Sequence, residues 1–260
     1  ANMRFPDLKQ RLRDGPLHGC FVTFPSAAIT EFTAAIGFDF VLIDNEHGNM
    51  NPETVEDMVR ASHCQQVPCL VRVPYNRAEY MRKALDFGAD GVQVPLVNTV
   101  EDARAAALPT LFPPQGERGV AFLPRAASYG MCADKARYLA EANASRILSV
   151  HIETIEAVEN LDEILATGLA DVYFIGPGDL AVSMGYGHDL NHPDVLATIE
   201  RCIRKIAASG NIAGTYVGTP ERAAEAISWG AHYLVTALTP HLVRGARHYL
   251  QITTHYPLST

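Results

Sequence analysis

Residues 37–48 read GFDFVLIDNEHG, and this stretch decides the fold. A glycine turn leads into four consecutive hydrophobes, which is the pattern of a strand buried on both faces of a parallel sheet. The strand then stops abruptly in a polar segment that contains Asp44, Glu46 and His47. These could be solvated loop residues, but a buried strand seldom ends this way unless its carboxyl end opens on a site. The stretch therefore favours an active site at this strand end.

The same pattern recurs along the chain, where a glycine turn precedes each of the apolar segments GVQVP, VYFIGP and YLVTA. Each occurrence indicates the end of a helix, a glycine turn and another buried strand. The expected strands span residues 19–24, 39–43, 69–73, 91–94, 147–152, 171–175, 212–217 and 232–236. Eight strands alternating with helix-compatible segments in 260 residues predict a closed (β/α)8 TIM barrel, an α/β fold, rather than an open doubly wound sheet. We expect one domain over residues 1–260, with a short helix at 6–14 closing the barrel floor and a long loop at 109–130.

Composition and charge exclude several classes of partner. Asp and Glu number 29 against 21 Lys and Arg, which gives a formal net charge of -8. An acidic chain without a long basic run is not expected to bind nucleic acid. It has no apolar stretch of the roughly 18 to 20 residues that span a bilayer, so no membrane association is expected. The five cysteines are odd in number and form no C-x-x-C pair, which is typical of reduced thiols in a cytoplasmic protein.

Polar residues at the strand ends should lie together, because the carboxyl ends of all barrel strands share one mouth. The candidates are Asp44, Glu46, His47, Arg72, Glu153 and Asp179. Arg72 lies inside the otherwise apolar strand LVRVP, and arginine is almost never buried without a partner. It could bind a substrate anion, or it could form an internal ion pair with Asp44 or Glu46.

Glu153 and Asp179 follow neighbouring strands, which predicts two carboxylates side by side at the mouth. Two ionised acids that close repel each other, so either one is protonated or a divalent cation lies between them. The sequence has no His-x-His or cysteine cluster, which argues against a closed zinc site. Oxygen ligands with open positions favour Mg²⁺ or Mn²⁺, with Co²⁺ as an alternative.

The lysines exclude one major mechanism. Only Lys9, Lys83, Lys135 and Lys205 are present, and all lie in segments that we expect to be helical. A Schiff-base aldolase or decarboxylase needs a desolvated lysine in its site, so that class is not expected.

With these residues assembled, the chain resembles the HpcH/HpaI aldolase family of metal-dependent class II pyruvate aldolases. The similarity runs from Leu17 to Ala246 through the motifs LIDNEHG (42–48), LVRVP (70–74), ALDFGADGVQVPLV (84–97), ERGVAFLPRAASYG (117–130), IETIEAVENLDEIL (152–165) and IGPGDLAVSMGY (175–186). The resemblance implies a carbon-carbon lyase that splits a 4-hydroxy-2-oxo acid reversibly into pyruvate, or a close 2-oxo acid, and an aldehyde. It also implies a homo-oligomer, a hexamer, whose C-terminal helix is exchanged between subunits.

The resemblance further implies a role for each candidate residue. His47 would be the catalytic base, supported by Asp44 and by Asp86 from a neighbouring subunit. Arg72 would bind the 2-oxo acid. Glu153 and Asp179 would hold the divalent metal. Further substrate contacts are expected from His151, Gly176, Pro177 and Gly178.

Two residues depart from the family pattern, and both could change the substrate preference. His151 stands where the family usually has glutamine, and Ala181 replaces a common serine. Alternation along the strand should turn His151 to the same face as Glu153. In the long loop, Arg118, Arg125 and Tyr129 either contact the far end of the substrate or are solvated surface residues.

Three other functions are possible for the same barrel. One is a CoA-thioester lyase of the citryl-CoA or malyl-CoA type, against which stands the lack of an obvious basic nucleotide pocket. The second is an oxaloacetate decarboxylase, which would form the same enolate. The third is a non-enzymatic barrel that binds a small acid, and the intact acid pair argues against it.

Overall fold

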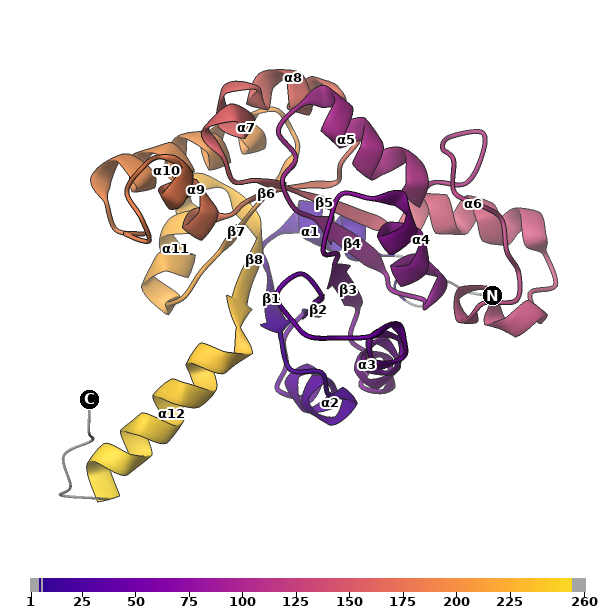
Figure 1. Cartoon of the computed structure of the whole chain (residues 1–260), viewed down its shortest axis with the longest axis horizontal. Helices are drawn as coiled ribbons and strands as arrows, with labels where there is room; N and C mark the ends of the chain where they lie inside the picture. The colour runs from indigo at the N-terminus through magenta and orange to yellow at the C-terminus, as the bar shows by residue number, and fades with distance from the viewer. Residues whose placement is uncertain (1–4, 6, 254–260) are drawn as a thin grey trace.

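The computed structural model describes residue 5 and residues 7–253, and its eight parallel strands close into a barrel in sequence order (Figure 1). The strands are β1 (Leu17–Val22), β2 (Phe40–Asp44), β3 (Cys69–Arg72), β4 (Gly91–Val94), β5 (Ile147–Ile152), β6 (Val172–Ile175), β7 (Ile212–Tyr216) and β8 (Ala231–Ala237). The predicted (β/α)8 barrel is confirmed, and each predicted strand lies within two residues of an observed one.

Helices follow the strands and cover the outside of the barrel (Figure 1). They are α1 (Leu8–Asp14), α2 (Ala27–Ala35), α3 (Pro52–Cys64), α4 (Ala78–Asp86), α5 (Val100–Ala107), α6 (Lys135–Ser145), α7 (Ile155–Glu159), α8 (Leu161–Ala166), α9 (Pro177–Ser183), α10 (Pro193–Ala208), α11 (Pro220–Trp229) and α12 (Leu238–Thr253). Several begin at a capping side chain, as at Asn51, which accepts a hydrogen bond from the Thr54 N–H before Pro52. The segment predicted as a long loop contains two short 3-10 helices, Leu108–Thr110 and Arg125–Gly130.

The barrel has an inner and an outer core, because successive side chains of a strand point to opposite faces. The outer core packs the helices onto the strands. The inner core is filled by large side chains, among them Phe40, Phe174 and Tyr233. Leu8 and Leu12 of α1 join this inner core and close the barrel floor, as the sequence predicted. The floor is therefore sealed, and the carboxyl ends of the strands remain as the open mouth.

The last helix, α12, leaves the barrel and projects into solvent (Figure 1). All its side chains from His241 to Leu250 are exposed, among them Leu242, Val243 and Tyr249.

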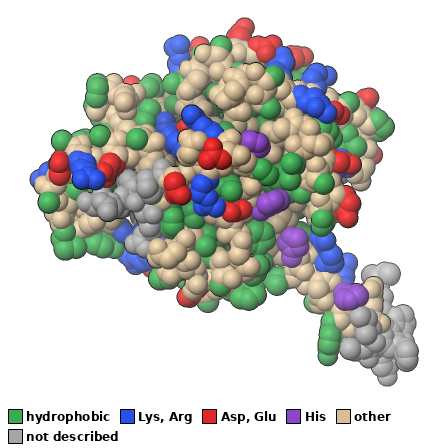
Figure 2. Space-filling view, turned by 180° about the vertical axis from the view of Figure 1, so that it is seen from behind, with side chains coloured by type: hydrophobic (Ala, Val, Ile, Leu, Met, Phe, Trp, Pro, Cys, Tyr) green, Lys and Arg blue, Asp and Glu red, His purple; other side chains and the backbone are tan. Residues whose placement is uncertain are grey.

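On the face drawn in Figure 2, acidic and basic side chains are interspersed, with no extended basic surface among the described residues there. Among the described residues, no helix has both the length and the apolar character needed to cross a membrane.

Candidate active site

Asp44 and Arg72 lie opposite each other at the carboxyl ends of β2 and β3. Arg72 Nε donates to Asp44 Oδ1 over 2.9 Å, and its Nη2 donates to Oδ2 over 2.7 Å. Its Nη1 lies 3.1 Å from Glu46 Oε2, so the guanidinium pairs with both acids named as possible partners. Burial would lower the pKa of Arg72, but the hydrogen bond and charge of Asp44 outweigh it and raise the pKa. Arg72 is therefore a fixed positive charge at the mouth.

The turn after β2 carries Glu46 and His47. Asp44 Oδ1 accepts from the backbone N–H groups of Glu46 at 3.2 Å and His47 at 3.3 Å, which fixes the turn. The His47 imidazole is 65% exposed, and among the described acids its ion-pair partner is Glu46, with Nε2 3.9 Å from Oε2. Asp44 thus supports His47 through the backbone. Burial raises the pKa of Glu46 although Arg72 opposes the rise, and the charge of Glu153 adds to it.

Glu153 follows β5 and is almost fully buried, at 3% exposure. Its Oε2 lies 2.6 Å from His151 Nδ1, and its Oε1 accepts from the Leu96 N–H over 2.8 Å. His151 and Glu153 therefore share a face, as the strand alternation predicted. Burial alone would raise the pKa of Glu153, but the charge and hydrogen bond of His151, aided by the Leu96 N–H, lower it.

Leu96 adopts a left-handed backbone, with φ of 54°, to make this contact. A non-glycine residue in that region costs on the order of 1–3 kcal/mol, and such residues cluster at functional sites. The strain at Leu96 therefore supports a function for the carboxylate that its N–H holds.

β6 places the glycine-rich turn beside Glu153, because Ile175 pairs with Ile152. A Cβ at Gly176 would lie 2.7 Å from Glu153 Oε2, so the absence of a side chain at Gly176 leaves the room that the carboxylate occupies. Pro177 and Gly178 then open α9, and Asp179 is an exposed acid in its first turn. The predicted substrate-binding turn and the second predicted metal ligand therefore follow the strand next to Glu153.

Glu153 has the capacity to bind a hard divalent cation whose other positions stay open. Each oxygen of Glu153 accepts one hydrogen bond and retains a second lone pair. Within the described ranges, no group of three or more His, Cys, Asp or Glu side chains could enclose a metal. Water and substrate oxygens would complete the shell, as Mg²⁺ commonly requires.

The described lysines lie in α1, α4, α6 and α10, away from the strand ends. Lys9 pairs with Asp171 and Lys205 with Asp162. A Schiff-base mechanism therefore has no candidate lysine at the mouth among the described residues.

Comparisons with known proteins identify the family of this chain. The family model for HpcH/HpaI aldolase/citrate lyase matches residues 17–246. The chain belongs to this family. It is 36% identical over 245 residues to the 2-keto-3-deoxy-L-rhamnonate aldolase of Escherichia coli (strain K12), covering 92% of this chain and 89% of the relative.

Solved structures place the fold in the same family. An HpcH/HpaI aldolase/citrate lyase family protein from Burkholderia cenocepacia J2315 matches with a TM-score of 0.89 and 35% identity, over 95% of this chain and 98% of that one. The citrate synthase SbnG matches with a TM-score of 0.85 and 26% identity, over 95% and 96% of the two chains. As an HpcH/HpaI family member with aldolase relatives, the protein is a carbon-carbon lyase.

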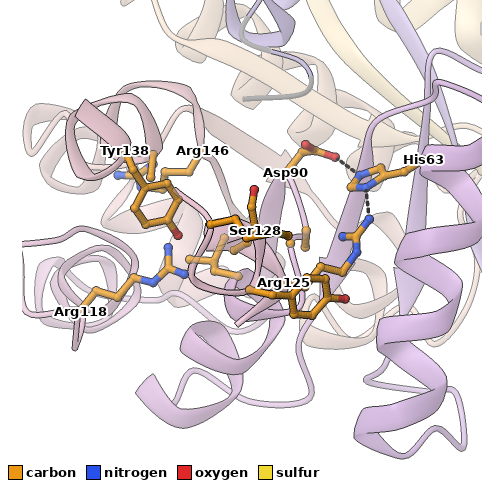
Figure 3. A pocket seen from close by; sticks show the side chains of 14 residues that line it. His63, Asp90, Arg118, Arg125, Ser128, Tyr138 and Arg146 are labelled. Carbon is orange, nitrogen blue, oxygen red and sulfur yellow. Dashed lines mark hydrogen bonds and ion pairs between the residues drawn. The ribbon is translucent and has the colours of Figure 1, made fainter. Parts of the chain in front are cut away.

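Asp86 and the loop residues lie far from the mouth of their own chain. Asp86 ends α4 and pairs with Arg118 over 2.8 Å. Arg118 and Arg125 line a cavity of about 330 Å³ together with Tyr129, beside the amino-terminal end of β4 (Figure 3). Arg125 donates to the Phe87 carbonyl and contacts His63.

Within one chain these residues do not reach the site. Tyr129 is 54% exposed, as the surface alternative predicted, whereas Arg118 is 5% exposed and is therefore not a solvated surface residue. The HpcH/HpaI role of Asp86 requires another subunit and stays a prediction. Ala181 is buried in the outer core, so its side chain packs against helices and does not line the mouth.

The sequence analysis missed Gln93 and Tyr233, which are fully buried inside the barrel of this HpcH/HpaI family member. Gln93 contacts His151 Nε2 at 2.7 Å, and Tyr233 donates to Gln93 over 2.9 Å. The available signal was a glutamine inside the apolar strand GVQVP, which needs a partner for the same reason as Arg72.

Proposed function

We propose that this protein is a divalent-metal-dependent aldolase that cleaves a 4-hydroxy-2-oxo acid reversibly to pyruvate, or a close 2-oxo acid, and an aldehyde. The observation that carries the proposal is the acidic mouth, where Arg72 lies among Asp44, Glu46 and Glu153, with Asp179 on the adjoining turn. The relatives at 36% identity are 2-keto-3-deoxy-L-rhamnonate aldolases, so a 2-keto-3-deoxy sugar acid is the first substrate to test.

The charges at the mouth favour a cation. Four carboxylates against one guanidinium leave a large excess of negative charge, to which a substrate carboxylate would add. Glu153 and Asp179 would hold the ion, with Mg²⁺ or Mn²⁺ preferred and Co²⁺ as an alternative. When bound, the ion would polarise the ketone of the 2-oxo acid and favour enolate formation.

Arg72 has hydrogen-bonding capacity left for the substrate. A guanidinium carries five N–H groups, and Asp44 and Glu46 engage three of them. One N–H on each Nη remains to bind the substrate carboxylate or the developing enolate oxygen. Because Asp44 holds the guanidinium in place before substrate arrives, this stabilisation needs no rearrangement during the reaction.

His47 is the group we assign to proton transfer. Its exposed imidazole would take the proton of the substrate 4-hydroxyl. The C3–C4 bond then breaks and the aldehyde departs. The electron pair of that bond stays with the 2-oxo acid, which becomes an enolate. Protonation of that enolate at C3 gives pyruvate. In addition, Asp86 from a neighbouring subunit would support His47.

We also propose a homo-oligomer, a hexamer, with α12 exchanged between subunits. In the single chain α12 leaves Leu242 at 44%, Val243 at 43% and Tyr249 at 66% exposure. Apolar side chains spaced along one exposed helix favour burial against a protein partner.

The decisive experiment is a coupled assay for pyruvate release. The panel holds several 4-hydroxy-2-oxo acids, with a 2-keto-3-deoxy sugar acid first, each with and without divalent metal. Oxaloacetate serves as the test of decarboxylation, and citryl-CoA or malyl-CoA as the test of thioester cleavage. Metal-dependent pyruvate release from at least one hydroxy-oxo acid is expected. Turnover of the CoA thioesters alone would overturn the assignment.

A further inference from the structure

A chain of hydrogen bonds runs through the inner core from Tyr233 on β8 to Glu153 at the mouth. Tyr233 Oη donates to Gln93 Oε1 over 2.9 Å, and Gln93 Nε2 lies 2.7 Å from His151 Nε2. His151 Nδ1 lies 2.6 Å from Glu153 Oε2. All four side chains are at most 3% exposed. Buried polar groups are costly unless each is hydrogen-bonded, so a fully bonded chain in an aromatic interior points to a specific use.

The chain holds the His151 ring in place. Burial raises the pKa of Tyr233, so its hydroxyl keeps its proton and donates to the carbonyl oxygen of Gln93. The Gln93 amide nitrogen then faces His151 Nε2, and His151 Nδ1 faces Glu153 Oε2. Both ring nitrogens therefore have a hydrogen-bonding partner, which fixes the plane of the ring.

We propose that Gln93 and Tyr233 are positioning residues that fix the His151 ring and, through it, the orientation of the Glu153 carboxylate. The proposal rests on the proposed function, because Glu153 is the expected metal ligand. Neither residue contacts the mouth itself. Each acts through His151, where the family usually has glutamine.

The packing of the inner core is arranged around these rings. His151 stacks on Phe174 with ring centroids 4.8 Å apart, and Tyr233 stacks on Phe40 at 4.6 Å. A Cβ on Gly214 would come within 2.9 Å of the Tyr233 ring, and a Cβ on Gly19 would overlap the ring of Phe40. Two strands therefore leave out side chains where the stacked rings lie. This holds the Tyr233 hydroxyl at a defined height below the mouth.

The carboxylate is also held from its other side. The Leu96 N–H donates to Oε1 over 2.8 Å, and Gly176 leaves space beside Oε2. With both oxygens fixed, the remaining lone pairs have defined directions. Loss of one support should therefore change metal affinity without unfolding the barrel. Loss of such a supporting partner typically weakens metal affinity or activity by roughly 10- to 100-fold.

The test uses Gln93→Leu and Tyr233→Phe in the full-length protein, with Tyr173→Phe as the matched control. Tyr173 is an equally buried tyrosine on β6, but it packs in the outer core, away from this chain of hydrogen bonds. ¹⁵N NMR of labelled histidine in metal-free protein reports the hydrogen bonding of the His151 ring, with its signals assigned by comparison with His151→Gln. Mn²⁺ dissociation constants from calorimetry report the effect on the ligand.

The Tyr173→Phe control should match the wild-type protein in its His151 ring signals and in Mn²⁺ affinity. Gln93→Leu should shift the His151 ring signals and weaken Mn²⁺ binding about 10-fold, and Tyr233→Phe should give the same changes to a smaller extent. Unchanged His151 signals in both variants would overturn the proposal, as would unchanged Mn²⁺ affinity in both. Glu153→Gln separates this from a failure of the proposed function: undiminished Mn²⁺ binding there would remove Glu153 as a ligand. The His151 ring signals would still decide the positioning role.

Discussion

Arg72→Ala should damage both stability and catalysis, and the structure allows the two effects to be separated. The substitution removes two hydrogen bonds to Asp44, which is 2% exposed, and the ion pair to Glu46. Removing one partner of a buried pair costs roughly 3–5 kcal/mol, because it leaves an uncompensated buried charge. For a domain of this size the lower end of that cost should lower the Tm by about 6–12 °C. The measurement is thermal unfolding, with Arg204→Ala as the control, because Arg204 is an exposed arginine that pairs only with Glu200 on its own helix among the described acids.

The catalytic loss should be separate from this destabilisation. Removing a preorganised charge from a developing enolate costs on the order of 10²- to 10³-fold in kcat. Deuterium exchange of the pyruvate methyl protons, measured well below the Tm of the variant, isolates enolate formation from carbon-carbon cleavage. Both the exchange and the cleavage should fall together. A folded Arg72→Ala protein that exchanges these protons at the parental rate would refute the role of Arg72 in enolate stabilisation.

The remaining predictions concern the metal, the base, the neighbouring histidine and the assembly. Chelator should abolish cleavage, Mg²⁺, Mn²⁺ or Co²⁺ should restore it, and borohydride with pyruvate should trap no adduct; full activity of the metal-free protein would contradict this. His47→Ala should lose cleavage by roughly 10²- to 10⁴-fold while keeping some methyl exchange, and an unchanged cleavage rate would remove it from the mechanism. His151→Gln should keep the fold and the pyruvate chemistry but shift Mn²⁺ affinity by roughly 10-fold or change the aldehyde preference. If the variant and the parent protein give the same metal and aldehyde titrations, His151 is only a packing residue. Light scattering at micromolar concentration should show an oligomer, and Leu242→Asp on α12 should weaken it; a monomeric parent would contradict the assembly.

The barrel was predictable because its signals are local. A glycine turn followed by an apolar run marks a buried strand in the sequence, as at Gly37 before β2. Eight alternating units of this kind permit few topologies. The mouth was predictable for the same reason, because strand ends fix which residues meet. Arg72 was identifiable as a charge that needs a partner, and its partners Asp44 and Glu46 were correctly named.

Other features depend on contacts between distant segments, which periodicity does not encode. Asp44 contacts His47 through the backbone N–H of that residue, while both of its carboxylate oxygens also accept from Arg72. The position of Arg118 beside Asp86 depends on how the loop folds back on α4. Tyr233 lies 140 residues from Gln93 along the chain, and only barrel closure brings them together.

Barrel closure also explains how a buried histidine is accommodated at position 151. A histidine at that depth needs a partner on each ring nitrogen, because an unpaired buried polar atom costs about 1–3 kcal/mol. Glu153 satisfies Nδ1, but Nε2 points into an aromatic interior, and there Gln93 supplies the partner. Gln93 in turn needs a donor for its own carbonyl oxygen, and Tyr233 supplies it. The three residues are therefore interdependent, so Gln93→Leu combined with His151→Gln should cost less than the sum of the two single changes in free energy of unfolding. Strict additivity in that double-mutant cycle would mean that position 151 does not depend on the interior chain.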